Sequence, residues 1–92
     1  MPVTVRIPTP LQRLSGGASE VTCSATNIAG VLEALEIQHP GMNERLTESG
    51  KVRRFINIYV NGEDIRALEA ERTALRDGDT VTIIAAIAGG NG

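Results

Sequence analysis

The residues best suited to chemistry lie close to the C-terminus, in the run Ala88-Gly89-Gly90-Asn91-Gly92. Glycine has no Cβ, so this run adds no packing and leaves the backbone free to adopt many conformations. One interpretation is a frayed terminus, which is common at domain ends. The other is a slim tether that threads into a partner's active site and presents a backbone carbonyl there. We therefore predict a flexible tail over residues 88–92, and its composition leaves both interpretations open.

The residue types that usually act as nucleophile or base are scarce, because the chain has one cysteine and one histidine. Cys23 falls on the inward side of an alternating segment, which favours a buried structural thiol over a nucleophile. His39 precedes Pro40 at the end of an apolar stripe. A helix cap or a partner of the helix dipole is a more common role there than a general base.

The remaining charged residues point to turns and loops rather than to a catalytic pair. Four acidic residues lie in expected turns, without the spacing of metal ligands: Glu63, Asp64, Asp77 and Asp79. A short basic run carries Lys51, Arg53 and Arg54, which indicates a solvated loop or, less commonly, a surface for an acidic partner. We expect no active site of the chain's own, hence a protein that is not an enzyme and binds no metal or other cofactor.

Length and charge limit the classes of function. The chain has 92 residues, which predicts a single domain over residues 1–92. Its formal net charge of −2 is too weak to indicate binding to nucleic acid or to an anionic membrane. No apolar run approaches the ~20 residues of a membrane span. A single cysteine forms no internal disulfide, so we expect a cytoplasmic protein.

Alternating apolar residues and turn signals predict the strands that precede the tail. The expected strands cover residues 3–7, 21–25, 55–60, 63–66 and 80–84. The first two are close enough in sequence to pair as a hairpin. Asn61-Gly62 predicts a type I′ hairpin turn, because both of its central positions need φ > 0. Asp77-Gly78-Asp79 turns the chain into the last strand.

One helix is expected between the two groups of strands. Thr26 or Asn27 is a suitable N-cap. The apolar residues Ile28, Val31, Leu32 and Leu35 follow at the spacing of one helical face. His39-Pro40-Gly41 ends this helix. A short helical turn is expected over residues 42–46, and a polar, mobile loop over residues 47–54.

This order of elements predicts the fold class. A helix that follows a hairpin must cover one face of the sheet. A right-handed crossover then places the first and last strands side by side and parallel. The prediction is an α+β protein with a β-grasp, or ubiquitin-like, fold: a mixed sheet with one main helix packed on one face.

The opposite face of that sheet is a candidate docking surface. Ile56 and Ile58 are expected to face the helix, so Phe55 and Tyr59 point to the outer face, together with Ile84 of the last strand. A partly apolar face beside a flexible tail is typical of a docking surface. The alternative is that these are scattered surface hydrophobes, which need no special explanation.

Three stretches resemble the ThiS/MoaD family of ubiquitin-like sulfur carriers: Asn57-Ile58-Tyr59-Val60-Asn61-Gly62-Glu63-Asp64-Ile65-Arg66, then Leu75-Arg76-Asp77-Gly78-Asp79-Thr80-Val81-Thr82-Ile83-Ile84, then Ala88-Gly89-Gly90. Each is a weak signal alone, but their order is specific and spans almost the whole chain. Two segments are most similar to the branch of the family that serves cysteine biosynthesis: Val3-Thr4-Val5-Arg6-Ile7-Pro8-Thr9-Pro10-Leu11 and Arg54-Phe55-Ile56-Asn57-Ile58-Tyr59-Val60-Asn61. Thiamine and molybdopterin biosynthesis are the alternative destinations.

The resemblance implies that an E1-like enzyme uses ATP to adenylate the carboxylate of Gly90, which is then converted to a thiocarboxylate. Ala88, Gly89 and Gly90 would thread into the partner's channel. Ile84 and Ile87, with Phe55 and Tyr59, would dock the E1-like enzyme. In the cysteine branch the sulfur acceptor is a PLP-dependent enzyme of the cysteine synthase type, and the carrier itself holds no cofactor.

The sequence departs from the family's pattern in one respect, because Asn91-Gly92 follows Gly90. We expect cleavage of the Gly90–Asn91 bond by a protease, with a zinc enzyme of the JAMM type as the candidate. An expression artefact and loss of the sulfur role are the alternatives. Two further functions remain open: a ubiquitin-like modifier joined to lysines through Gly90, and an interaction module with an inert tail.

Overall fold

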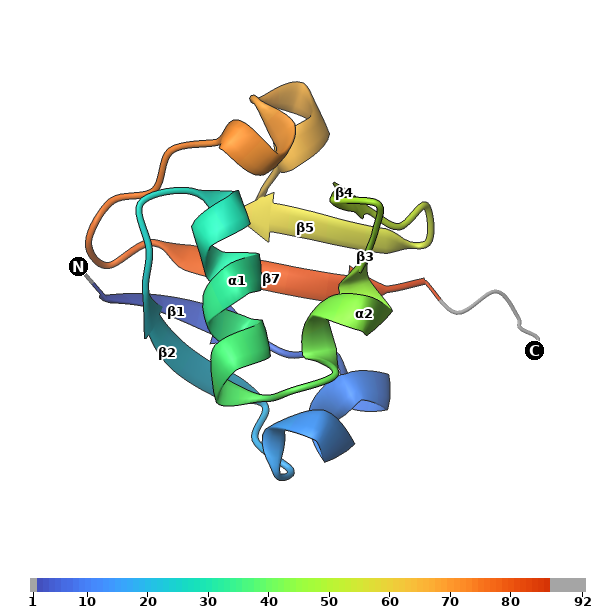
Figure 1. The fold of residues 1–92 in the computed structure, drawn as a ribbon. Coiled ribbons are helices and arrows are strands. Elements are labelled where there is room, and N and C mark those ends of the chain that lie inside the picture. Colours follow the sequence, from blue (N-terminus) through green and yellow to red (C-terminus); the bar gives the residue numbers. More distant parts are fainter. Residues whose placement is uncertain (1, 87–92) are drawn as a thin grey trace.

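The first half of the chain builds a hairpin and the helix that covers it. The computed structural model describes residues 2–86. Strands β1 (Pro2–Arg6) and β2 (Glu20–Ser24) pair antiparallel, and the 3-10 helix η1 (Thr9–Ser15) lies between them in the chain. Helix α1 (Ile28–Gln38) follows and packs across the sheet, with the short helix α2 (Met42–Leu46) beside it (Figure 1).

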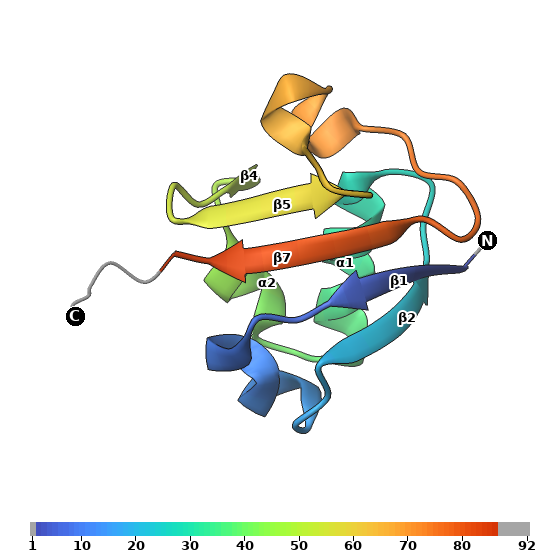
Figure 2. The ribbon, with the colours of Figure 1, turned by 180° about the vertical axis from the view of Figure 1, so that it is seen from behind.

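The second half completes the sheet. Its strands and 3-10 turns are β3 (Thr47–Glu48), β4 (Lys51–Val52), β5 (Ile56–Val60), β6 (Glu63–Asp64), η2 (Ile65–Ala67), η3 (Ala70–Arg72) and β7 (Thr80–Ala85). The main sheet has the order β2-β1-β7-β5-β6, with β1 and β7 parallel at its centre. Helices α1 and α2 cover one face, and the other face is open (Figure 2). This is the predicted β-grasp arrangement.

Helix α1 begins and ends where the sequence indicates. The Asn27 side chain caps it by accepting a hydrogen bond from the Gly30 N–H at 2.8 Å. The predicted stripe of Ile28, Val31, Leu32 and Leu35 is buried. His39 is the C-cap, and its N–H donates to the Leu35 carbonyl.

The core between helix and sheet is aliphatic, as expected from one Phe, one Tyr and no Trp. The side chains that are least exposed are Ile28, Leu35, Met42, Leu46, Ile58, Val3, Val5, Val31 and Val81. Cys23 belongs to this core, which confirms the prediction of a buried thiol. Burial also raises the pKa of its thiol, so the reactive thiolate is disfavoured.

Residues 47–54, expected to form a polar, mobile loop, contain regular secondary structure. Strands β3 and β4 form a small antiparallel hairpin around Ser49-Gly50. Both turn residues have positive φ, 55° and 82°, which is the requirement of a type I′ turn. Serine is rarely found at a position with positive φ, so Ser49-Gly50 does not predict a hairpin turn as Asn-Gly would.

Two other segments differ from the sequence expectation. Residues 9–15 form η1, which the strand-ending prolines Pro8 and Pro10 do not by themselves predict. The short strand expected over residues 63–66 ends at Asp64, and the chain continues as η2 because the Asp64 carboxylate caps it by accepting from the Arg66 N–H at 2.8 Å. Within residues 2–86, no helix is long and apolar enough to cross a membrane.

Candidate functional site

Strand β7 carries the chain from the centre of the sheet toward the predicted tail (Figure 1). The last described residue, Ala86, donates its N–H to the carbonyl of Phe55 at 2.7 Å. This bond extends the pairing of β7 with β5 by one residue and anchors the chain where it leaves the sheet. The predicted tail and docking residues Ile87, Ala88, Gly89, Gly90 and Asn91 lie outside the described part of the chain.

The outer face of the sheet presents Ile84 to solvent, as predicted. Ile84 is 44% exposed and pairs with Asn57 of β5. Tyr59, a half-buried residue on the same face, pairs with Thr82 and is therefore a diagonal neighbour of Ile84. The structure thus brings these two candidate docking residues together. Ile84 lies two residues before Ala86, the last described residue.

The surroundings of Ile84 are more polar than the sequence suggests. The Arg66 guanidinium donates to the Asn57 side-chain carbonyl at 2.8 Å and to the Asp64 carboxylate at 2.7 Å. Its hydrogen bonds and charge lower the pKa of Asp64, so this carboxylate is ionised at neutral pH. Around Ile84, the outer face therefore presents one exposed aliphatic side chain next to the hydrogen-bonded Arg66–Asp64 pair, and not a broad apolar patch.

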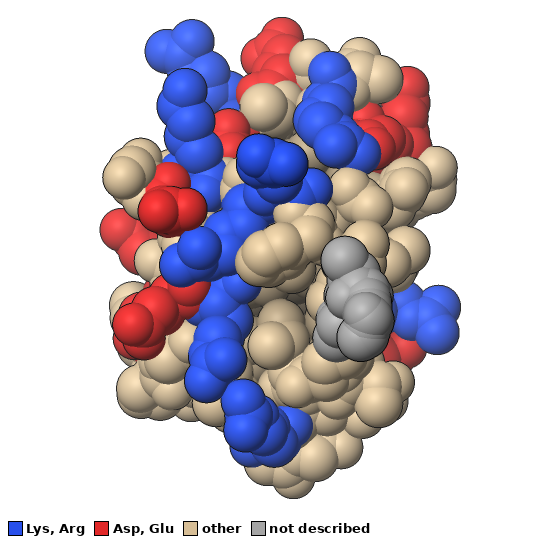
Figure 3. All heavy atoms as spheres, turned by 90° about the vertical axis from the view of Figure 1, so that its right-hand side faces the viewer, with Lys and Arg blue, Asp and Glu red and all other residues tan. Residues whose placement is uncertain are grey.

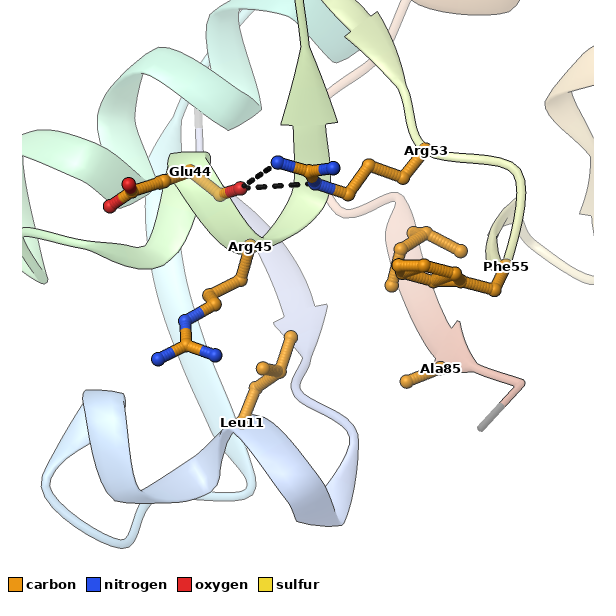
Figure 4. Close-up of a pocket in the computed structure, with 7 residues that line it drawn as sticks. Leu11, Glu44, Arg45, Arg53, Phe55 and Ala85 are labelled. Atoms are coloured by element: carbon orange, nitrogen blue, oxygen red, sulfur yellow. Dashed lines mark hydrogen bonds between the residues drawn. The ribbon is translucent and has the colours of Figure 1, made fainter. Parts of the chain in front are cut away.

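The structure corrects the placement of Phe55. Phe55 lies in a turn one residue before β5, so the alternation of that strand does not fix its direction. Its ring, 50% exposed, lines a cavity of about 420 Å³ together with the inward-facing Ile56 and Ala85 (Figure 4). Phe55 therefore belongs to the end of the sheet from which the chain departs, and not to the outer face beside Tyr59.

This cavity also has a charged side. Leu11 of η1 and two residues of α2, Glu44 and Arg45, line it opposite Phe55, and Arg53 closes its top (Figure 4). The Arg53 guanidinium is held by the Glu44 backbone carbonyl at 3.0 and 3.1 Å. Seen from this end, Lys and Arg side chains form a continuous stripe on the surface (Figure 3).

Two of the acidic residues singled out in the sequence, Asp64 and Asp79, have structural roles in the folded chain. The described residues contain no group of three or more His, Cys, Asp or Glu side chains that could hold a metal ion. Asp79 takes part in turn structure: its carboxylate accepts from the Arg76 N–H at 2.8 Å and from the Asn61 side chain at 3.0 Å. These bonds lower the pKa of Asp79 and fix the turn that leads into β7.

The cavity residues Leu11, Arg45 and Ala85 were not singled out by the sequence. They come from three elements far apart in the chain, and only the folded structure brings them together.

Comparison with known proteins places the chain among small carrier proteins. The ThiS family matches residues 5–90. Sulfur carrier protein CysO of Mycobacterium tuberculosis is 46% identical over 93 aligned positions, which cover 98% of this chain and all of that protein. A chain in the crystal structure of the Amycolatopsis orientalis BexX/CysO complex superposes with a TM-score of 0.91 at 41% identity, covering 96% of this chain and 99% of the other.

A second kind of relative is a protein modifier. Small archaeal modifier protein 3 of Haloferax volcanii is 38% identical over 63 residues, which is 68% of each chain. The family match and the similarity to CysO extend over nearly the whole of this chain, and the observed β-grasp agrees with both. The chain therefore belongs to the ThiS family.

Proposed function

We propose that this protein is a sulfur carrier whose reactive group is the carboxylate of Gly90. The observation that carries the proposal is the 46% identity to a sulfur carrier protein over 98% of the chain. Two further observations support it. The family match ends at residue 90, and the observed fold is the β-grasp of the solved CysO chain.

The proposed reaction begins with activation, because a carboxylate is a poor electrophile. An E1-like enzyme joins the Gly90 carboxylate to the α-phosphorus of ATP, which releases pyrophosphate and leaves an acyl-adenylate. Hydrosulfide supplied by a sulfur donor then attacks the acyl carbon, and AMP leaves with the bonding electron pair. Loss of the proton on the sulfur gives the thiocarboxylate. The carrier is a substrate in each step, and ATP is used by its partner.

Slim residues suit this role for a steric reason. Gly89 and Gly90 have no Cβ, and Ala88 has a single methyl group, so little obstructs their passage through a narrow channel. Docking is assigned to the outer face of the sheet around Ile84, because a partner that covers this face also meets the strand that leads to the tail. Ile87 is assigned to the same contact.

Activation at Gly90 requires cleavage when Asn91 follows it, since the Gly90 carbonyl is then part of a peptide bond. We infer that a protease hydrolyses the Gly90–Asn91 bond, and a zinc protease of the JAMM type is the candidate. The carrier would then deliver its sulfur to a PLP-dependent enzyme of the cysteine synthase type. The similarity to CysO supports cysteine biosynthesis as the destination.

The test is reconstitution of activation and sulfur transfer with two purified forms of the chain, one ending at Gly90 and one ending at Gly92. Each is incubated with an E1-like enzyme of the same organism, ATP and a sulfide source. We expect pyrophosphate release and a thiocarboxylate only for the form ending at Gly90. Absence of activation of that form by any E1-like enzyme of the organism would refute the proposal.

A second candidate function is modification of other proteins through an isopeptide bond between Gly90 and a lysine. The similarity to small archaeal modifier protein 3 favours keeping this candidate. Both functions use the same activated carboxylate, so activation does not distinguish them. Recovery of lysine-linked Gly90 conjugates from cells would support modification, and their absence under conditions where the thiocarboxylate accumulates would exclude it.

A further inference from the structure

The end of the sheet from which the tail departs carries a cationic surface, which we define as Lys51, Arg45, Arg53 and Arg54. Figure 3 views this end and shows Lys and Arg side chains gathered in a stripe. The whole chain carries a formal net charge of −2, so this local excess of cations is opposite in sign to the net charge of the protein. Such segregation generates a local positive potential that attracts anionic surfaces.

Most of these cations are not neutralised within residues 2–86. Arg53 forms an ion pair with Glu48 at 3.3 Å, but the Glu48 side chain is 73% exposed and contributes weakly. In the described part of the chain, Lys51, Arg45 and Arg54 have no ion pair. Figure 4 shows that the carboxylate of Glu44 points away from the cavity, so two guanidinium groups and no carboxylate face it.

The cavity beside these arginines is apolar at its base. Leu11 and Ile56 are buried, Ala85 is half-buried, and the ring of Phe55 stands 50% exposed at the rim. A volume of about 420 Å³ accommodates a large aliphatic or aromatic side chain of a partner. Aromatic and arginine residues around a small apolar hollow are the composition found at the centre of protein interfaces.

The position of this surface decides which partner meets it. Gly90 is the fourth residue after Ala86, and four extended residues span at most about 14 Å. An enzyme that holds the Gly90 carboxylate in its active site must therefore approach Ala86 to within this reach. Two cavity residues lie next to Ala86: the Phe55 carbonyl accepts a hydrogen bond from the Ala86 N–H, and Ala85 precedes Ala86 in the chain. The cavity therefore lies within the surface that such an enzyme covers.

We propose that the E1-like enzyme recognises this surface with an acidic patch that pairs with the cationic surface and one apolar side chain that enters the cavity. This inference rests on the proposed function and adds a second contact to the one around Ile84. The acidic patch accelerates docking and fixes the orientation in which the tail enters. The apolar side chain contributes to the lifetime of the complex.

The test measures activation of the chain ending at Gly90 by pyrophosphate release, for wild type, Arg45→Glu and Arg76→Glu. Arg45 is exposed and has no ion pair in the described residues, so its reversal leaves the fold intact. Arg76 is also an exposed arginine, and it precedes β7 at the opposite end of the sheet from Ala86. The two variants therefore carry the same change of charge at different ends of the molecule.

We expect Arg45→Glu to raise KM about tenfold with little change in kcat, and Arg76→Glu to stay within about twofold of wild type. The difference should shrink in high salt, because exposed charges are screened. Phe55→Ser should raise KM by a similar factor that does not depend on salt. Thermal unfolding of each variant confirms that it is folded.

The outcomes separate the two proposals. Activation of wild type with equal KM for Arg45→Glu and Arg76→Glu would overturn this inference and leave the carrier function standing. A defect of Arg45→Glu that is confined to sulfur delivery would assign the surface to the acceptor enzyme and would also overturn it. Failure of the wild-type chain to be activated would overturn the carrier function and this inference together.

Discussion

The most informative perturbation of the docking face is Ile84→Asp. Fully burying an isoleucine contributes roughly 1.5–3 kcal/mol, and Ile84 has 44% of its surface still exposed in the free chain. Covering it in a complex therefore contributes about 1 kcal/mol. An unpaired carboxylate in the contact costs roughly a further 1–3 kcal/mol, because it loses water without gaining a partner. The sum of about 2–4 kcal/mol predicts a Kd that is about 30-fold to 700-fold higher.

The assay is titration calorimetry of the chain ending at Gly90 into the E1-like enzyme without ATP. Ile84→Ala removes the apolar contact alone and should weaken binding only about fivefold. Ile37→Asp is the matched control: Ile37 is 78% exposed and lies on helix α1, on the covered side of the sheet. It introduces the same side chain far from the outer face and should leave Kd unchanged.

Thermal unfolding of both aspartate variants shows whether a loss of binding reflects a loss of fold. Equal affinities of Ile84→Asp, Ile37→Asp and wild type would refute the assignment of the outer face as the docking surface. Equal weakening by both aspartates would attribute the effect to overall charge instead.

Three further predictions test the tail, the core and the turn that leads into β7. Gly90→Ala in the chain ending at residue 90 should slow adenylation without changing Tm, since the new methyl group obstructs the channel but removes no packing; unchanged activation kinetics would remove the threading argument. Leu46→Ala, at a side chain with 0% exposure, should lower the free energy of unfolding by about 2–5 kcal/mol, and a urea titration that shows less than about 1 kcal/mol would contradict the packing described for α2. Asp79 has a lowered pKa in the folded chain. Its contribution to stability is therefore present above the unfolded pKa of about 3.9 and is lost as pH falls through the lower folded value. The urea midpoint of wild type should accordingly drop more steeply as pH falls below about 4 than that of Asp79→Asn, and parallel curves would show that these hydrogen bonds add nothing.

Local signals in the sequence predicted much of the fold. Asn61-Gly62 forms the expected hairpin turn with φ of 50° and 89°, because few other residues adopt positive φ twice in succession. Asn27 caps α1 as expected, and Gly30 leaves room for that cap: a Cβ there would meet the Asn27 oxygen and the Ala25 Cβ at 3.3 Å. Each of these features is decided by residues within a few positions of one another.

The surface at the end of the sheet could not be predicted in the same way. Phe55 lies just outside a strand, so the period of two that places Tyr59 and Ile84 on the outer face gives no direction for it. Arg45 and Leu11 meet Phe55 only because α2 and η1 pack at the same end of the sheet. Contacts of this kind depend on tertiary packing, for which a single sequence carries no periodic signal.

Gly90 is proposed to carry sulfur as a C-terminal thiocarboxylate. Intact mass spectrometry of the protein from its own cells tests this most directly. The account predicts a chain that ends at Gly90, part of it heavier by the difference between one sulfur atom and one oxygen atom. Alkylation of the thiocarboxylate before analysis should shift only that heavier species. A population that continues through Asn91-Gly92 and contains no such species, in cells that are actively assimilating sulfur, would contradict the account.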